Sequence, residues 1–104
     1  MMLKSVDKIT LTYHEGCLKP EGSLTIESVP CADKQIVPLL SQFNEVVKLD
    51  LAAAENNDTA GLAWLINLKA NLKKSGKSLQ LLNVPNALKK LSKLSDADKL
   101  LEID

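Results

Sequence analysis

Short apolar segments alternate with a longer helical segment in the second half of the sequence, and this alternation constrains the fold most strongly. Residues 46–51 (VVKLDL) and 78–82 (SLQLL) are apolar runs of strand length. Between them, residues 59–75 have the length of a helix, with Asp58 as N-cap and Gly76 as C-terminal cap. A strand–helix–strand unit with short connections joins parallel strands through a right-handed crossover, so the sequence predicts an α/β fold.

The first half of the sequence predicts a hairpin and a helix. Residues 6–13 and 23–29 alternate apolar with polar side chains, which is typical of paired antiparallel strands. Residues 14–22 contain two Gly and one Pro, and we expect them to form the connecting loop. Residues 30–43 change to a helical period, and Pro38 favours a helix that begins shortly before it.

The remaining segments complete one domain over residues 1–104. Residues 52–57 are expected to form a loop, Pro85 opens a third helix, and residues 96–104 form a short tail with one or two helical turns. A chain of 104 residues suits a single core. The predicted fold is α/β, with a mixed sheet of about four strands and three to four helices, in which an N-terminal hairpin precedes βαβα units.

Composition excludes several classes of protein. The chain has 13 Lys, no Arg and 13 acidic residues, and a neutral chain without Arg is a poor nucleic-acid binder. The longest stretch without a charged residue, 78–88, has eleven residues, whereas a membrane-spanning helix needs about 20. The N-terminus has no apolar core of a signal peptide, so we expect a cytoplasmic protein.

Candidate catalytic and metal-binding groups are few. His14 is the single histidine, and Cys17 and Cys31 form no metal-binding motif, so the simplest interpretation is two reduced thiols and a surface imidazole. A Cys–His pair of His14 and Cys17 on one turn is the alternative, but the sequence suggests no third, orienting group. Phosphate-binding glycine loops and hydrolase motifs are also absent, so we expect no enzyme activity, no metal and no cofactor.

The turn before the long helix is the first candidate binding site. Asp58, Thr59, Ala60 and Gly61 combine a carboxylate, a hydroxyl and two small residues at a strand-to-helix junction. Free N–H groups make a helix start locally positive, and small side chains leave it accessible to an anion or to a polar group of a partner. The alternative is a plain N-cap with tight packing of helix on sheet.

Trp64 is the second candidate. On a helical wheel it points away from the apolar stripe and shares the polar side with Asn67 and Asn71. A large aromatic residue there is either an interface anchor or is covered by a flanking loop.

Three lysines, Lys89, Lys90 and Lys93, crowd the outer face of the third predicted helix. Such a run usually forms a solvated face, and the alternative is attraction to acidic partners or anionic lipid.

Several of these segments together resemble a STAS domain, the fold of anti-sigma-factor antagonists and of the cytoplasmic tails of sulfate transporters. The resemblance is carried by KLDL at 48–51, DTAGLA at 58–63, SGKSL at 75–79 and NVP at 83–85. Signalling members resemble Asp-Ser-Ser-Gly at the second of these motifs, and their second Ser is phosphorylated. Ala60 occupies that position here, so Thr59 carries the one hydroxyl of the motif.

A Thr directly after the Asp is similar to the MlaB group of STAS domains, the small subunits of the Mla phospholipid-transport ABC system of Gram-negative bacteria. The resemblance implies a non-catalytic accessory subunit that binds and supports the cytoplasmic ATPase and reaches the inner membrane only through that complex. Thr59 matches the hydroxyl on which the function of that family depends, and it is a possible phosphorylation site. Together with the helix start and the helical wheel, this predicts partner binding by Asp58, Thr59, Ala60, Gly61, Trp64 and Asn67. Two alternatives stay open: an anti-sigma-factor antagonist in a partner-switching pathway, and a nucleotide or anion sensor.

Overall fold

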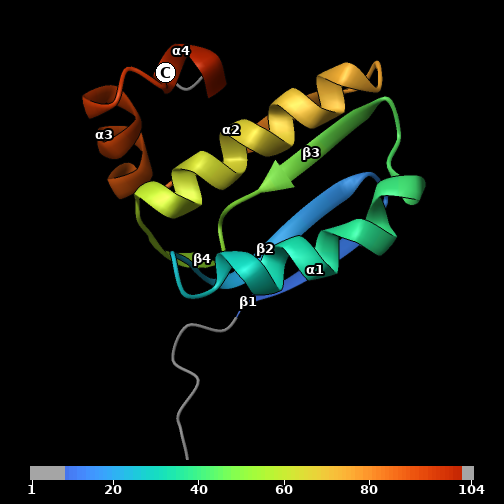
Figure 1. Ribbon diagram of the computed structural model, residues 1–104, viewed down its shortest axis with the longest axis horizontal. Helices are drawn as coiled ribbons and strands as arrows, with labels where there is room; N and C mark the ends of the chain where they lie inside the picture. The colour runs from blue at the N-terminus through green and yellow to red at the C-terminus, as the bar shows by residue number, and fades with distance from the viewer. Residues whose placement is uncertain (1–8, 102–104) are drawn as a thin grey trace, which may run out of the picture.

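The predicted order of strands and helices is found in the computed structural model, which describes residues 9–101. The chain runs β1 (Ile9–His14), β2 (Cys17–Leu24), α1 (Val29–Leu39), a 3-10 turn η1 (Leu40–Gln42), β3 (Val46–Asp50), β4 (Ala54–Asn57), α2 (Thr59–Lys74), β5 (Ser78–Leu82), α3 (Asn86–Leu94) and α4 (Asp98–Leu101). The fold is therefore mixed α/β with an N-terminal hairpin, as the sequence predicts (Figure 1).

Strand β2 organises the sheet because it pairs along both of its edges. The order is β1-β2-β3-β5, in which β1 is antiparallel to β2 and the pairs β2–β3 and β3–β5 are parallel. The first residues of β2 pair with β3, and its last residues, Gly22 to Leu24, pair with β4. The predicted crossovers are thus present, and β4 is an additional short strand.

The turn of the hairpin is shorter than the predicted loop of residues 14–22. Its turn consists of Glu15 and Gly16, both with positive φ (52° and 79°), as a two-residue hairpin turn with the right twist requires. Residues 17–22, expected in the loop, belong to β2, and residues 25–29 are not a strand. The predicted stretch 6–8 lies outside the described residues. A Glu at the first turn position is not a recognised hairpin signal, so the sequence did not reveal this turn.

Pro20 misled the prediction because it lies inside a strand that pairs on both sides. It is opposite Leu11, whose N–H points away from β2, so the nitrogen of Pro20 points to the other edge. At that edge β2 changes partner from β3 to β4, and a missing donor is tolerated there. The predicted loop 52–57 is wrong for residues 54–57, because the end of β2 offers β4 an edge to pair with.

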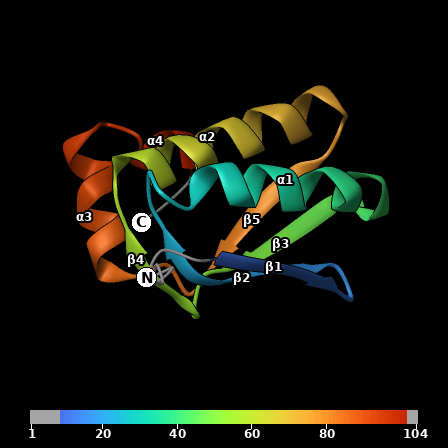
Figure 2. The same cartoon turned by 60° about the horizontal axis from the view of Figure 1, so that its bottom comes forward.

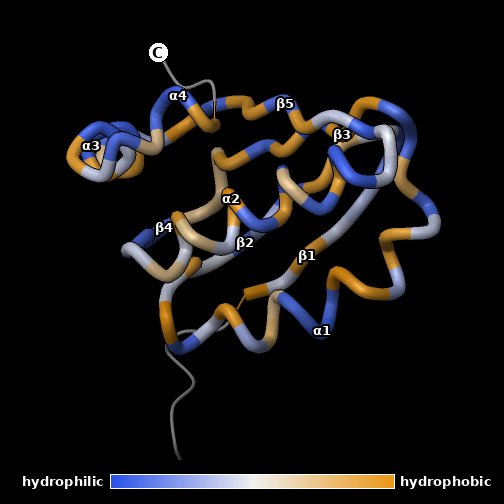
Figure 3. Tube along the Cα trace, turned by 45° about the horizontal axis from the view of Figure 1, so that its top comes forward, coloured by the Kyte–Doolittle hydropathy of each residue, from blue (hydrophilic) through white to orange (hydrophobic). Residues whose placement is uncertain are grey.

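Helices α1 and α2 lie side by side on one face of the sheet (Figure 2), and α3 and α4 lie at one end of the molecule. The strands direct aliphatic side chains towards these helices: Ile9, Leu11, Leu18, Leu24, Val47, Leu49 and Leu79 are buried. The opposite face is polar, and its exposed residues include Thr10, Thr12, Lys19, Glu21, Lys48 and Gln80. The alternation of hydrophobic and hydrophilic residues along the chain is visible in Figure 3.

Helix α1 begins nine residues before Pro38, not shortly before it as predicted. Pro30 occupies the first turn, where a missing N–H is harmless, and the Ser28 hydroxyl secures the preceding turn by donating to the Ser23 carbonyl at 2.6 Å. Pro38 lies in the last turn, and the chain tightens into η1 directly after it. Pro38 cannot donate to the carbonyl four residues earlier, but so close to the end of α1 this loss leaves the preceding turns intact, and the helical pattern extends to both sides of it.

Trp64 is packed between α1 and α2, so of the two alternatives it is the covered one, and the element that covers it is helix α1 and not a flanking loop. Its exposed fraction is 5%, and its indole Nε1 donates to Asp33 Oδ1 on α1 at 2.7 Å. The buried residues of α2 cover a wide arc because the helix contacts the sheet with one side and α1 with another. Asn67 and Asn71, at the edge of that arc, are exposed.

The outer edge of the sheet at β1 is covered by one side chain of α1. Gln35 accepts from the Leu11 N–H through Oε1 at 2.7 Å and donates to the Ile9 carbonyl through Nε2 at 2.8 Å. The primary amide therefore makes the two bonds that a neighbouring strand would make. An edge strand whose backbone groups are paired in this way is a poorer template for pairing with another chain.

We predict that Gln35→Leu lowers the free energy of unfolding by about 1–3 kcal/mol, because two backbone groups lose their partner. Hydrogen exchange at the Leu11 amide should become at least tenfold faster, and the variant should aggregate at lower concentrations than the parent. The exposed neighbour Lys34 provides the control, since Lys34→Leu adds the same side chain without touching β1. Unchanged protection of Leu11 in Gln35→Leu would contradict the edge-capping role.

We predict that Trp64→Ala lowers the free energy of unfolding by about 3–5 kcal/mol, as expected for removal of a buried aromatic side chain. Trp64→Phe keeps most of the apolar contact but loses the bond to Asp33, and should lower it by about 1–2 kcal/mol because the exposed carboxylate can rehydrate. Urea denaturation of Trp64→Phe, Asp33→Ala and the double variant measures the coupling. Asn67→Ala, on the same helix but exposed, should change stability by less than about 0.5 kcal/mol.

Candidate functional site

The carboxylate of Asp58 fixes the start of α2 in two directions. Its Oδ1 accepts from the Gly61 N–H at 3.0 Å, which is the N-cap bond that the sequence predicts. Its Oδ2 accepts from the Ile26 N–H at 3.0 Å and so ties the turn before α1 to the start of α2. Both oxygens are engaged within the chain, so Asp58 positions this site.

Gly61 allows the first turn of α2 to lie directly against the end of β2. A Cβ atom at this position would meet the carbonyl oxygen of Leu24 at 2.1 Å, much closer than any real contact. Its neighbour Leu62 donates to the Asp58 carbonyl at 3.0 Å and starts the intrahelical ladder. Gly61 is buried, and its contribution to the site is the close approach of helix and strand.

Thr59 and Ala60 are the members of the motif that a partner can reach. Thr59 is exposed and Ala60 is partly exposed. Both precede the first intrahelical bond, so their N–H groups belong to the positive end of the helix. A hydroxyl group and a small side chain at this position provide a polar contact with little steric obstruction.

Ile26 adds an apolar group beside this helix start, and the sequence analysis missed it. Its side chain is 66% exposed, while its backbone N–H is held by Asp58. The alternating pattern of residues 23–29 predicts a strand of the hairpin, in which the apolar side chain of Ile26 would face the core. An exposed large apolar residue held rigidly next to polar groups is typical of an interface anchor.

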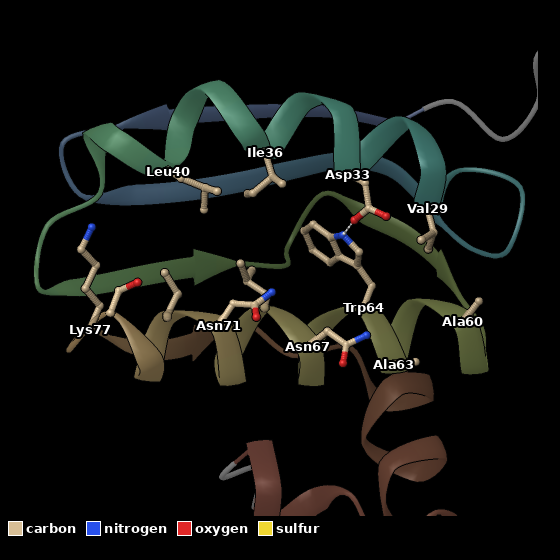
Figure 4. A pocket seen from close by; sticks show the side chains of 13 residues that line it. Val29, Asp33, Ile36, Leu40, Ala60, Ala63, Trp64, Asn67, Asn71 and Lys77 are labelled. Atoms are coloured by element: carbon tan, nitrogen blue, oxygen red, sulfur yellow. Dashed lines mark hydrogen bonds between the residues drawn. The ribbon is translucent and has the colours of Figure 1, made fainter.

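A groove of about 400 Å³ extends from Ala60 along the contact between α1 and α2. Figure 4 shows Trp64 inside it with its indole directed at Asp33, while Ala60, Ala63, Asn67 and Asn71 line the α2 side. From the α1 side come Val29, Asp33, Ile36 and Leu40. Small and amide side chains on one wall and aliphatic groups on the other make the groove mixed in polarity.

The structure thus brings Asp58, Thr59, Ala60 and Gly61 together at one helix start, and Asn67 lies at the rim of the adjacent groove. Trp64 also lines the groove, but it is buried and offers a partner little accessible surface. We define the α2 docking surface as Ile26, Thr59, Ala60, Ala63 and Asn67.

Of the groups considered for catalysis or metal binding, His14 and Cys17 lie on the other face of the sheet, whereas Cys31 lies on α1 near the Ile9 carbonyl of β1. His14 and Cys17 are opposite each other in the hairpin, but the imidazole Nε2 contacts Glu15 Oε1 at 2.9 Å, and both cysteines are free thiols. Asn83 Nδ2 and the Ala52 N–H each donate to the Asp50 carboxylate at 3.0 Å and hold its pKa below its usual range. Within residues 9–101 no group of three or more His, Cys, Asp or Glu side chains is placed to hold a metal ion.

We predict that Gly61→Ala lowers the free energy of unfolding by at least about 2 kcal/mol, because the helix must move off the Leu24 carbonyl. Helix propensity alone predicts the opposite sign, a gain of up to about 1 kcal/mol for Gly→Ala. The exposed Ala63 is the matched control, since Ala63→Gly should show only the propensity effect. Urea denaturation of both variants decides the question, and a Gly61→Ala protein more stable than the parent would refute the close contact.

None of the helices in residues 9–101 has the length and apolar character that crossing a membrane requires. A comparison of the sequence with curated proteins finds no match. Among solved structures, the unphosphorylated anti-sigma factor antagonist SpoIIAA superposes with a TM-score of 0.61 at 14% identity, covering 83% of this chain and 82% of that one. A structure described as Mglu superposes with a TM-score of 0.56, also at 14% identity, covering 74% of this chain but only 19% of that one.

These two likenesses establish a shared fold. The family assignment comes from the sequence: the family model described as MlaB, STAS domain, matches residues 9–102, nearly the whole chain. The DTAG motif at the start of α2 and the strands and helices around it fall inside that match. The chain therefore belongs to the MlaB family of STAS domains.

Proposed function

We propose that this chain is a non-catalytic accessory subunit that binds and supports the cytoplasmic ATPase of a phospholipid-transport ABC transporter. The observation that carries the proposal is an exposed Thr59 at a rigidly held helix start, in a chain that belongs to the MlaB family. Under this proposal the protein is cytoplasmic and is associated with the inner membrane only through the transporter complex. It needs no cofactor of its own.

The different roles of the four motif residues support binding through the α2 docking surface. Asp58 and Gly61 hold the backbone, so Thr59, Ala60 and Ile26 are presented in one arrangement before a partner arrives. Preorganised contacts lose little entropy on binding. Ile26 supplies the apolar area that was assigned to Trp64 from the sequence, and Trp64 contributes by fixing α1 against α2.

The anti-sigma-factor antagonist is the alternative to be tested. The fold that the chain shares with SpoIIAA is compatible with it, but the position of the phosphorylated Ser in signalling members is occupied by Ala60. A phosphate on Thr59 would add a charge of about −1.5 to −2 beside Asp58, which disfavours it. The same carboxylate already neutralises the positive helix start, which argues against a nucleotide or anion sensor.

We predict that Thr59→Ala weakens binding to the ATPase subunit about three- to tenfold, the effect of losing one neutral hydrogen bond. Ile26→Asp should weaken it by at least about thirtyfold, because a buried anchor becomes charged. Thr59→Glu, which imitates phosphorylation, should abolish co-purification. Binding is measured by co-purification and titration with the ATPase subunit of a Mla-type transporter from the same organism, and the thermal melt of each variant reports folding.

Leu94→Asp is the matched control, since Leu94 is 85% exposed on α3 and lies outside the α2 docking surface. It should bind as the parent does. If Thr59→Ala and Ile26→Asp both fold and bind the ATPase normally, the docking surface is elsewhere. Failure of the parent protein to bind any ABC ATPase, together with capture of an anti-sigma factor, would favour the antagonist.

A further inference from the structure

Zero net charge conceals a strong separation of charge along the chain. Residues 59–95 contain seven lysines and no Asp or Glu, whereas residues 9–58 contain eight acidic residues and three lysines. Six of these lysines belong to α2 and α3, and Lys77 lies directly before β5, so one part of the folded domain is basic. A local excess of one charge attracts ligands of the opposite charge.

Part of this basic region is concave. A groove of about 580 Å³ lies on the flank of α2 that faces α4 and β5, and it is lined by Ile66, Lys69, Ala70, Lys73, Lys77, Ser78, Lys99 and Leu100. The bounding elements α2 and α4 are both visible in Figure 1. Four of the eight lining residues are lysines, and no carboxylate lines the groove within the described part of the chain.

The lysines differ in their roles. Lys69 donates to the Leu100 carbonyl at 2.7 Å and so ties the end of α4 to α2. Lys73 and Lys99 are exposed, and Lys77 is half-buried. Between them lie apolar groups, of which Leu100 is 59% exposed. The groove therefore offers ammonium groups around an aliphatic floor, and we call it the basic groove.

We propose that the basic groove binds an extended acidic segment of a partner protein, with its carboxylates on Lys73, Lys77 and Lys99 and its aliphatic side chains on Ile66 and Leu100. The proposal concerns the flank of α2 opposite to the one that contacts α1, and it does not depend on the function proposed above. It applies to any partner that carries such a segment.

Three features favour an acidic peptide as occupant. The first is charge complementarity, since among residues 9–101 every ionisable group that lines the groove is cationic. The second is shape, because a concave groove encloses a chain segment, whereas a flat bilayer surface would touch only its rim. The third is position, because Ser78 at the start of β5 lines the groove and β5 is the last strand in the sheet order. An extended peptide can align with such a strand.

The test uses the whole chain and a fluorescein-labelled peptide of alternating Glu and Leu, followed by fluorescence anisotropy. We expect saturable binding that weakens when the salt is raised from about 50 to about 300 mM, because ion pairs at a surface are screened. The triple variant Lys73→Gln, Lys77→Gln, Lys99→Gln should bind at least about tenfold more weakly. Lys69 is left unchanged because it holds α4 in place.

Two controls separate the groove from the general charge of the domain. The triple variant Lys89→Gln, Lys90→Gln, Lys93→Gln removes the same charge from α3 and should bind the peptide within about twofold of the parent. A Gln-Leu peptide should not bind. Equal losses in the two triple variants, absence of peptide binding, or binding to phosphatidylglycerol vesicles in place of the peptide would each overturn the proposal. Thr59→Ala should leave peptide binding unchanged, so this test is independent of ATPase binding.

Discussion

The contact between the first turn of α2 and the end of β2 determines the geometry of the whole candidate site. At Gly61 the helix lies so close to the Leu24 carbonyl that no side chain fits between them. Asp58 then holds the helix start on one side and the turn at Ile26 on the other. Because these contacts fix the backbone, Thr59 is presented at a defined position. The DTAG motif therefore consists of two residues that build the site and two that a partner can reach.

The sequence predicts the fold correctly wherever one local signal dominates. Asp58 before a long helical pattern locates the start of α2, and the apolar runs at 46–51 and 78–82 locate β3 and β5. The prediction fails where the structure of a segment depends on the strand that it pairs with. The polar residues of β4 form a strand because the end of β2 is available to them, and Pro20 lies in a strand because β2 changes partner beside it. These effects depend on residues far apart in the sequence.

Trp64 shows the same limitation at the level of the site. A helical wheel assigns one buried face to a helix, and α2 has two neighbours, the sheet and α1. The second neighbour covers the side that the wheel treats as polar, and it supplies the acceptor Asp33 for the indole N–H. The exposed apolar residue at the site is Ile26, which the alternating pattern of residues 23–29 assigns to a strand although it lies in a turn. The motif could be predicted from the sequence, and its apolar neighbour could not.

Helix α2 has an accessible groove along each of two flanks, and this arrangement limits what one partner can cover. The groove on the α1 side begins at Ala60 and has a mixed polar and apolar lining, whereas the basic groove lies on the side of α4 and β5. Lys77 lines both, at the end of α2 opposite to Thr59. A partner that binds at Thr59 and Ile26 therefore leaves most of the basic groove free. Since α2 is held by Gly61 at one end and by Lys69 through α4 further along, ligands on the two flanks contact the same rigid helix without competing for the same atoms.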